Sequence, residues 1–497
     1  MKIFLLTGLL WFQCFNFSSI LAQNQGNGIQ AYPNNPHYLS WGNTPVFLIG
    51  AAGFHSWTPN SRPGTAQIEN QLEKMGKLIN EINSPHIMGM VRWLPYDPMN
   101  HLHDGKVKEV LQPWKKNPDG KYDLSQFSPD WEKRLLKLLE SSLEKRIIVV
   151  MELWDDWSVT RGPGGAYDPG GNFGWNGHPF NPKNNINYDE ETLPATTQAC
   201  EAPFYQTLPS KSNNQEVFQY QKIYIDHLLS LIKGYPHVLL NVNNESRADL
   251  VWSRYWAEYA KKQFPMIGDM PSTNRKDGGG ECIDGFNPMA LALDPLYGFV
   301  DISQGVSGHE FNSPTAQAIE GGKRIMAYRE AMKANGQVKP LVVSKDYTRD
   351  ENGGDIVIWS RFINGTASTR FHRPAADAPP SVVEFQHAAM LRLGKFVSKI
   401  KFWEFSPSPQ LITKLPEGMA ANALSNETDV LVLQLLGGQK NVAMEILLPA
   451  GQWKMTWIDP STGLKIEEYP IAHSKNSLSL KIPSDSLHLI ALLEKDE

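Results

Sequence analysis

Acidic, basic, amide and indole side chains lie at or just after the ends of six short apolar runs of the sequence. The members of this set are Arg92, Trp93, Glu152, Trp154, Asp155, Asn244, Glu245, His309, Glu310, Lys345, Asp346, His372 and Arg373. Carboxyl groups can serve as general acids, bases or nucleophiles, and indole rings offer flat faces to sugar rings. Gathered at one rim, these side chains would suit hydrolysis of a glycosidic bond. The fold must therefore bring the ends of the runs together.

The alternation of the chain indicates which fold could do so. Apolar runs are separated by amphipathic stretches of helical period, and Ser128-Pro129 and Ser313-Pro314 are typical helix starts. The predicted strands are 45–50, 85–93, 146–151, 237–243, 264–269, 299–304, 340–344 and 367–371. Because parallel neighbours need helical crossovers, eight such repeats predict a closed (β/α)8 TIM barrel with its site at the carboxyl ends of the strands. An open doubly wound sheet is the alternative.

The pattern changes beyond residue 400. We expect the barrel over 23–406, a linker over 407–420, and a small antiparallel β-sandwich over 421–497 with a tight turn at 459–463. Trp453 and Trp457 are evenly spaced on one predicted strand, so they share a face. Packing against the barrel is the favoured role of these rings, and stacking on a glycan is the alternative.

Residues 1–22 have the features of a signal peptide. Lys2 precedes an apolar stretch too short to span a bilayer, and a cleavage point follows Ala22. Export would leave Cys200 and Cys282, which could form a disulfide in an oxidising compartment but lack zinc-ligand spacing. The mature protein is expected to be secreted or periplasmic.

Composition and missing motifs narrow the function further. The 497 residues are 41% apolar and 20% charged, with a net charge of -5, which is typical of a globular protein and disfavours a nucleic-acid partner. The sequence has no Walker loop, no GxGxxG fingerprint, no HExxH motif and no nucleophile elbow. We expect no cofactor, no catalytic metal and no membrane span. The expected partner is a poly- or oligosaccharide, and the oligomeric state is left open.

Two resemblances favour a carbohydrate-active barrel. Asn244-Glu245 after the fourth strand, with Arg92 in the second, resembles the large clan of (β/α)8 retaining glycoside hydrolases. In that clan the strand-four Glu is the general acid/base and the preceding Asn contacts the sugar 2-hydroxyl, which implies these roles for Glu245 and Asn244. The stretches WNGHPFNPKNNINY, ASTRFHRP and WIDPSTG resemble secreted bacterial glycosidase-like barrels whose terminal domain is labelled a collagen-binding domain of a collagenase. This label carries no evidence of peptidase activity.

Lys345 departs from the clan, which has its nucleophilic Glu at this position of strand seven. A lysine cannot attack an anomeric carbon as a carboxylate does. The protein could be an inverting enzyme, an enzyme with a displaced nucleophile, or a non-hydrolytic barrel. Candidate bases are Glu152, Asp155, Asp156 and Glu310, and candidate nucleophiles are Asp346 and Glu310. We expect Lys345 to point toward a carboxylate other than Glu245, because an ammonium would oppose the protonation that a general acid needs.

The loop 158–214 is long and rich in Gly, Pro and Asn, as lids and binding loops are. Trp175 and His178 are its candidates for substrate contact, and a lid packed on the barrel without touching ligand is the alternative. The sequence thus predicts an exported glycoside hydrolase with Glu245 as general acid. A catalytically silent glycan-binding protein on the same barrel is the other hypothesis. Substrate contacts are expected from Arg92, Trp93, Glu152, Trp154, Asp155, Trp175, His178, Asn244, His309, Lys345, His372 and Arg373.

Overall fold

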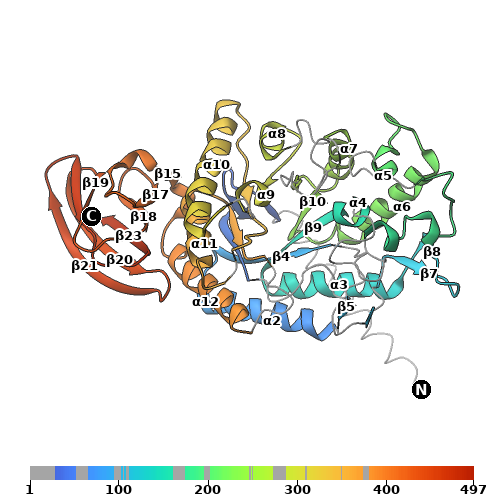
Figure 1. Ribbon diagram of the computed structural model, residues 1–497, viewed down its shortest axis with the longest axis horizontal. Coiled ribbons are helices and arrows are strands. Elements are labelled where there is room, and N and C mark those ends of the chain that lie inside the picture. The colour runs from blue at the N-terminus through green and yellow to red at the C-terminus, as the bar shows by residue number, and fades with distance from the viewer. Residues whose placement is uncertain are drawn as a thin grey trace, which may run out of the picture.

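The computed structural model describes residues 28–51, 65–94, 102–103, 106–107, 111–160, 174–194, 202–245, 248, 250–271, 287–307, 311–348, 350–372 and 380–496. They form an α/β barrel and, beside it, a C-terminal β domain (Figure 1). The predicted signal peptide, Cys200 and Cys282 lie outside the described residues. Within those residues, no helix is long and apolar enough to cross a membrane.

Short parallel strands form the barrel wall. β3 (Thr44–Gly50), β4 (Ile87–Trp93), β9 (Ile147–Asp155), β10 (Val238–Asn244) and β11 (Ile267–Gly268) pair in this order, and β14 (Ser368–Arg370) pairs with β3. β12 (Val300–Asp301) pairs with β13 (Leu341–Val342). Backbone hydrogen bonds from Asp301 to Asp269 and from Ala367 to Leu341 join this pair to its neighbours, so the circuit closes. The predicted (β/α)8 barrel is confirmed, because local apolar runs and the crossover rule determine it.

Alternate residues of each strand face the two sides of the wall. In β4, Met88 and Met90 belong to an apolar cluster enclosed by the strands. Ile87, Val91 and Trp93 pack instead in the layer beneath the helices. Arg92 shares the spacing of the methionines, so this alternation directs its side chain into the barrel.

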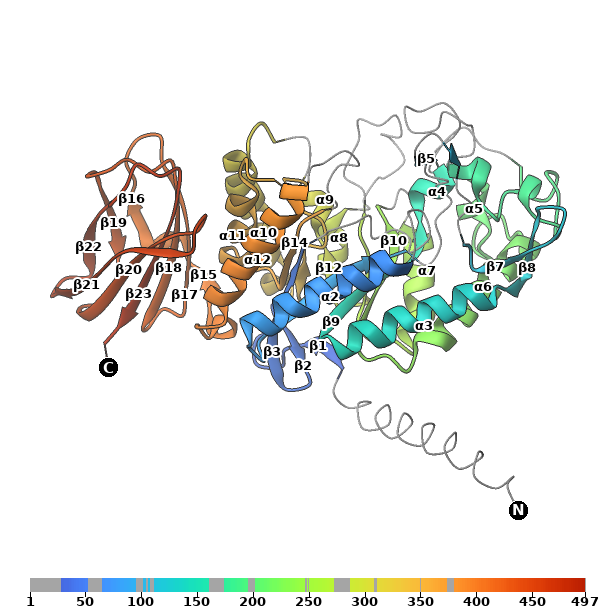
Figure 2. The same cartoon turned by 90° about the horizontal axis from the view of Figure 1, so that it is seen from below.

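The helices surround the strands (Figure 2). The longer ones are α2 (Thr65–Ile82), α3 (Pro129–Glu144), α6 (Gln215–Ile232), α7 (Leu250–Lys261), α10 (Pro314–Ala334), α11 (Gly354–Ile363) and α12 (Pro380–Val397). The shorter ones are α4 (Asp156–Thr160), α5 (Pro203–Gln206), α8 (Pro288–Leu293) and α9 (Ser303–Val306). Ser128, Asn214 and Ser313 cap α3, α6 and α10, and each side chain accepts a hydrogen bond from the backbone N–H three residues later. These caps fix where the long crossover helices begin.

Smaller elements extend the barrel. β2 (Leu39–Trp41) pairs antiparallel with β3, and β1 (Ile29–Ala31) pairs antiparallel with β2. Two hairpins precede α3, one of β5 (Leu102–His103) with β6 (Lys106–Val107) and one of β7 (Trp114–Lys116) with β8 (Tyr122–Phe127). The short 3-10 helices η1 (Gly174–Gly177) and η2 (Pro182–Asn184) lie in the long loop after α4, and η3 (Phe402–Glu404) ends the barrel.

The C-terminal domain is a sandwich of two antiparallel sheets, as predicted. The larger sheet contains β15 (Ser406–Pro407), β17 (Ala420–Ser425), β18 (Val430–Leu436), β23 (His488–Lys495), β20 (Gly451–Asp459) and β21 (Leu464–His473). The smaller contains β16 (Ile412–Lys414), β19 (Ala443–Leu447) and β22 (Ser477–Lys481). The segment 407–420, predicted as a linker, instead contains β16 and the second residue of β15. Pro407 is compatible with β15 because that strand lies at the sheet edge, where a missing N–H breaks no ladder bond.

Trp453 and Trp457 fill the core between the two sheets. They are 1% and 0% exposed and belong to the same apolar cluster as Met455. Neither predicted role, packing on the barrel or stacking on a glycan, is correct. The alternate residue Ile458 packs toward the barrel instead, because strand alternation sends the two sets to opposite faces.

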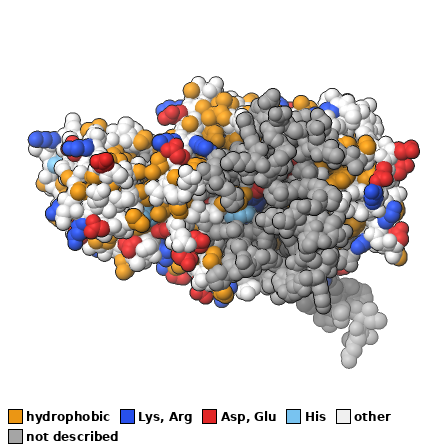
Figure 3. All heavy atoms as spheres, in the orientation of Figure 1, with side chains coloured by type: hydrophobic (Ala, Val, Ile, Leu, Met, Phe, Trp, Pro, Cys, Tyr) orange, Lys and Arg blue, Asp and Glu red, His pale blue; other side chains and the backbone are white. Residues whose placement is uncertain are grey.

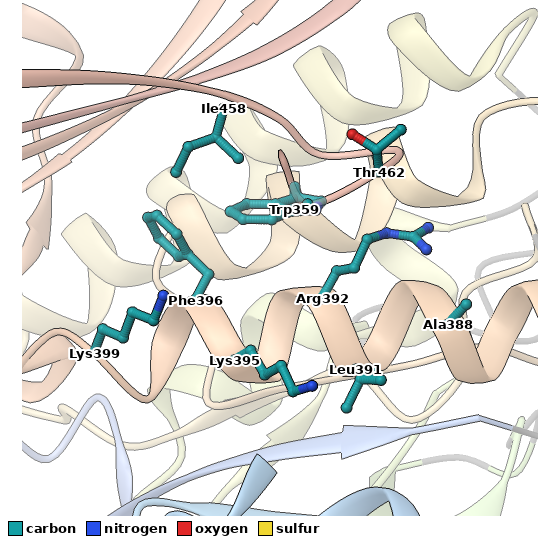
Figure 4. Close-up of a pocket in the computed structure, with 10 residues that line it drawn as sticks. Trp359, Ala388, Leu391, Arg392, Lys395, Phe396, Lys399, Ile458 and Thr462 are labelled. Carbon is teal, nitrogen blue, oxygen red and sulfur yellow. The ribbon is translucent and has the colours of Figure 1, made fainter. Parts of the chain in front are cut away.

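The other face of the larger sheet covers the barrel. Leu424, Val432 and Ile490 join the apolar core of the barrel. A cavity of about 420 Å³ also lies between α12 and the turn after β20, where Figure 4 shows Trp359, Arg392 and Thr462. Arg392 Nε donates to the backbone oxygen of Pro460 at 2.9 Å across this boundary. On the face shown in Figure 3, acidic and basic side chains of the described residues are interspersed.

Candidate active site

A salt bridge joins Lys345, which follows β13, to Glu245, which follows β10. The Lys345 ammonium contacts Oε1 of Glu245 and donates to Oδ1 of Asn244 at 2.6 Å. The side chain of Lys345 has no exposed surface, whereas that of Glu245 is 12% exposed. Glu245 has φ +52°, a left-handed conformation that is uncommon for a non-glycine residue. Residues held in such conformations cluster at functional sites.

Two further donors converge on the same carboxylate oxygen. Gln304 Nε2 in α9 and the Tyr347 hydroxyl each donate to Oε1 of Glu245 at 2.9 Å. Gln304 also donates to the Tyr347 oxygen at 2.6 Å. The ring of Tyr347 lies 4.7 Å from the ring of His372, which follows β14. Three donors, one of them cationic, stabilise Glu245 as a carboxylate.

Asn244 connects this pair to a second salt bridge. Its Oδ1 also accepts from Nη2 of Arg92 at 2.7 Å, and its Nδ2 donates to Oδ1 of Asp155 at 2.7 Å. Arg92 Nε donates to Oε1 of Glu152 at 2.8 Å. One hydrogen-bonded network therefore joins residues at the ends of β4, β9, β10 and β13. We call it the mouth cluster, and its members are Arg92, Glu152, Asp155, Asn244, Glu245, Gln304, Lys345 and Tyr347.

Burial and neighbouring charges shift the titration of the mouth cluster. Burial lowers the pKa of Lys345 to about 8, and the Arg92 guanidinium acts in the same direction against Glu245 and Glu152. Burial raises the pKa of Glu152, although Arg92 opposes this effect. Burial and the Glu245 carboxylate raise the pKa of Tyr347 well above its usual value, so its hydroxyl keeps its proton. Lys345 is therefore cationic at neutral pH but easier to deprotonate than a surface lysine.

The prediction that Lys345 points away from Glu245 is wrong. The neighbouring carboxylate of Asp346 accepts instead from Arg361 Nε at 2.9 Å, Ser307 Oγ at 2.5 Å and Thr369 Oγ1 at 3.0 Å. Neither side chain of the Asp346–Arg361 pair has any exposed surface. The structure thus separates Asp346 from the mouth cluster and does not place it where the predicted nucleophile would act.

Two indoles predicted to bind substrate face the helices instead. Trp93 is 4% exposed and stacks on Trp131 of α3, with ring centroids 6.4 Å apart. Trp154 is fully buried, with ring centroids 5.9 Å from Trp252 and 5.4 Å from Trp256 of α7. The prediction of substrate contact is wrong for both, because these large rings are buried beneath the helices.

The described part of the loop 158–214 packs on the barrel. The rings of Trp175 and His178 stack 5.4 Å apart, and Phe204 of α5 lies 5.6 Å from His178 and 5.4 Å from Trp154 of β9. His178 has no exposed surface, and burial lowers its pKa to about 3, so its ring is neutral. This arrangement agrees with the packed-lid alternative, and the prediction that His178 binds substrate is wrong.

Other predicted residues lie beside the cluster or beyond the described part of the chain. His372 is 5% exposed and lies against Tyr347. His309, Glu310 and Arg373 lie outside the described residues.

Gln304 and Tyr347 were missed by the sequence interpretation. Gln304 is the last residue of the predicted strand 299–304, and Tyr347 lies two positions after Lys345. Their places at strand ends could have indicated them, but neither an amide nor a phenol by itself signals hydrolytic chemistry. Over the ranges that the structure describes, no group of three or more His, Cys, Asp or Glu side chains could hold a metal ion.

Solved structures share this architecture. A protein described as a glycoside hydrolase matches 95% of this chain and 97% of its own length, with a TM-score of 0.57 and 12% identity. A glycoside hydrolase family 5 protein from Bacteroides vulgatus matches 95% of this chain and 94% of its own, with a TM-score of 0.56 and 13% identity. The fold is that of glycoside hydrolases. No family model and no curated protein matches the sequence, and at these identities the structural likeness shows the fold alone.

Proposed function

We propose that this chain is a glycoside hydrolase in which Glu245 protonates the leaving glycosidic oxygen. The observation that carries this proposal is the exposure of Glu245. Its side chain is 12% exposed, whereas the other carboxylates of the mouth cluster, Glu152 and Asp155, have no exposed surface. Glu245 follows β10 at the rim where barrels of this kind place their chemistry. The fold shared with glycoside hydrolases favours a poly- or oligosaccharide as the substrate.

The proposal requires a second carboxylate. Glu152, Asp155 and Asp156 are fully buried, and Asp346 is paired with Arg361. By elimination among the predicted candidates, we assign the role of base or nucleophile to Glu310, which follows β12 in the sequence. Replacing Glu310 by Gln should then abolish turnover while the protein still binds the substrate.

The presence of Lys345 favours a second candidate function, in which the barrel binds a glycan without hydrolysing it. A lysine stands where the clan that the sequence resembles has its nucleophile, and its ammonium holds Glu245 as a carboxylate. Glu245 and Tyr347 could then accept and donate hydrogen bonds to sugar hydroxyls without cleaving a bond.

A panel of plant and algal polysaccharides and oligosaccharides separates the two functions. Released reducing ends measure hydrolysis, and affinity electrophoresis on the same panel measures binding. We expect hydrolysis by the intact protein and a loss of at least about 100-fold in Glu245→Gln, the scale of a positioned general acid. The matched control is Glu73→Gln, which removes an exposed ion pair with Lys145 at 2.9 Å and should leave the rate unchanged.

Each outcome of this panel decides between the functions. Binding without products would favour the glycan-binding function. Full hydrolysis by Glu245→Gln would contradict the role of Glu245.

We also propose that the protein is exported. The support is the pattern of residues 1–22, with Lys2 before an apolar stretch and a cleavage point after Ala22. Amino-terminal sequencing of the mature protein should find Gln23 first. An intact Met1 on the mature protein would contradict export through this segment.

A further inference from the structure

We infer that Lys345 stores the proton that Glu245 delivers, so that the acid of this site is the Lys345–Glu245 pair. This inference rests on the proposed function. It addresses a conflict within the site, because three hydrogen-bond donors to Oε1 favour a carboxylate, whereas a general acid must carry a proton when it meets its substrate.

Of the two groups in the mouth cluster that accept a hydrogen bond from Lys345, one can also accept its proton. The buried ammonium has two acceptors in the mouth cluster, Oε1 of Glu245 and Oδ1 of Asn244 at 2.6 Å. The Asn244 oxygen is an amide oxygen that also accepts from Arg92 at 2.7 Å, so it cannot take a proton. The Glu245 carboxylate is the basic acceptor of the two.

The charged groups around Lys345 also favour the transfer. Arg92 in β4 keeps its proton at any accessible pH, and Glu152 in β9 is held by Arg92. Arg92 and burial both destabilise the ammonium, and they lower the pKa of Lys345 to about 8. A bound sugar would displace water from the mouth of the barrel, and desolvation disfavours an ion pair relative to a neutral amine beside a neutral acid.

The step balances in atoms and charge. The Nζ–H bond of Lys345 breaks, the nitrogen keeps the electron pair, and an O–H bond forms on Glu245. Glu245 gives this proton to the glycosidic oxygen as the bond to the anomeric carbon breaks, and that oxygen leaves as a hydroxyl with the bonding electrons. A water molecule supplies oxygen and one hydrogen to the anomeric carbon, and its other proton passes to solvent. Lys345 then regains a proton from solvent, so each cycle consumes one water. Lys345 acts through Glu245 and is a positioning residue.

Two substitutions separate proton storage from charge. Lys345→Arg keeps a cation beside Glu245 but does not release a proton, and Lys345→Met removes both properties. Lys345→Arg should lose at least about 100-fold in kcat/KM on glycosides with poor leaving groups, the scale of a positioned acid. Lys345→Met should lose less than Lys345→Arg, because removing the cation lets Glu245 take its proton from solvent. Both should lose much less on aryl glycosides with good leaving groups, which need no protonation. The activity of the wild-type protein on glycosides with poor leaving groups should fall as pH rises through about 8. This decrease is the basic limb of the pH–rate profile, and neither variant should retain it.

Lys339→Met is the matched control. Lys339 is also buried, at 5% exposure, and burial lowers its pKa to about 8. Its ammonium donates to the backbone oxygen of Asp294 at 2.5 Å, and the residue precedes β13, at the end of the strand opposite Lys345. This variant should keep the leaving-group dependence and the pH profile of the wild type.

A titration by NMR of lysine labelled at Cε tests the pair without relying on the folding of a lysine variant. Two resonances should titrate near pH 8, that of Lys339, which should not respond to Glu245→Gln, and that of Lys345. The titration of Lys345 should move to lower pH in Glu245→Gln, because the carboxylate that favours the ammonium is then absent. A Lys345→Arg variant with the wild-type rate and pH limb, or a Lys345 titration unchanged in Glu245→Gln, would overturn the inference. Absence of hydrolysis by the intact protein would instead contradict the proposed function.

Discussion

Lys345 and Asp346 are neighbours in the sequence, but their side chains enter two separate networks. Lys345 contacts Glu245 in the mouth cluster, and Asp346 pairs with Arg361 of α11. Successive side chains of an extended segment point to opposite sides, so a carboxylate one position along cannot substitute for one at position 345. Position 345 therefore supplies no carboxylate to the mouth cluster, and Asp346 does not replace it.

Asp346→Asn should change stability more than catalysis. The variant leaves the Arg361 guanidinium buried without its counter-charge, which costs about 3 to 5 kcal/mol in the free energy of unfolding. Urea unfolding measures this loss, and kcat/KM measured well below the unfolding midpoint should stay within a few-fold of the wild type. A variant of wild-type stability that has lost its activity would restore Asp346 as a catalytic candidate.

Much of the fold could be predicted because its signals are local. Apolar runs predicted β3, β4 and β9 to within a few residues of their observed bounds, and Ser313-Pro314 predicted the start of α10. The barrel rule then placed Arg92, Glu152, Asn244, Glu245 and Lys345 at one rim, where the mouth cluster lies.

The details of contact could not be predicted in the same way. Glu245 and Lys345 are 100 residues apart in the sequence, and whether they touch depends on the tertiary placement of two strand ends. The direction of Trp93 depends on its register in β4, which a shift of one residue would reverse. The segment 407–420 has the Pro and Ser residues of a linker, but long-range pairing with β17 and β19 makes strands of β15 and β16.

Asp269 should make the stability of the protein depend on pH. It follows β11, and its Oδ1 accepts from the backbone N–H groups of Asn243 at 2.9 Å and Met270 at 2.8 Å. Burial raises its pKa from 3.8 to about 7, so between these values the folded chain holds a proton that the unfolded chain has released. The contribution is complete below pH 4 and is lost as pH rises through about 7.

Asp269→Asn removes this titration but keeps the shape of the side chain. Relative to the variant, the wild type should lose at most about 4 kcal/mol of unfolding free energy between pH 4 and 8. Urea unfolding of both proteins at several pH values measures the difference. A difference that is constant across this range would show that Asp269 does not titrate as expected.

His488 should link the stability of the two domains. Its Nδ1 lies 3.1 Å from Oδ2 of Asp355 in α11, and Gln434 donates to the backbone oxygen of Ile356 at 2.9 Å beside it. His488→Leu would leave the Asp355 carboxylate buried without this partner, at a cost of about 1 to 3 kcal/mol. Thermal unfolding measures this loss, and hydrolysis should be unaffected. His473→Leu, at the end of β21, is the matched control and should change stability little; an equal loss in both variants would contradict the link.

Asn244 should control how tightly Lys345 holds its proton. Its Oδ1 accepts from both Lys345 and Arg92, so Asn244→Asp adds negative charge where two cations converge. The added charge favours the ammonium, and the pKa of Lys345 should rise above its value of about 8. The limb of the pH–rate profile that follows Lys345 should therefore move to higher pH. At neutral pH the rate on poor leaving groups should fall, because the proton is released less readily.

The measurement is kcat/KM for Asn244→Asp between pH 5 and 10, on glycosides with poor and good leaving groups. The substitution also removes the Nδ2 donor to Asp155, so the two facing carboxyl groups would share a proton at the acidic end of the range. The fall in rate at the basic end of the profile depends on Lys345 alone, so it measures the change in the pKa of Lys345. Asn335→Asp, at the exposed C-terminal end of α10, is the control and should leave the limb in place. In Asn244→Asp, a basic limb that stays fixed or moves to lower pH would show that this limb does not report the titration of Lys345. The reason is that an added negative charge stabilises the ammonium and raises the pKa of Lys345.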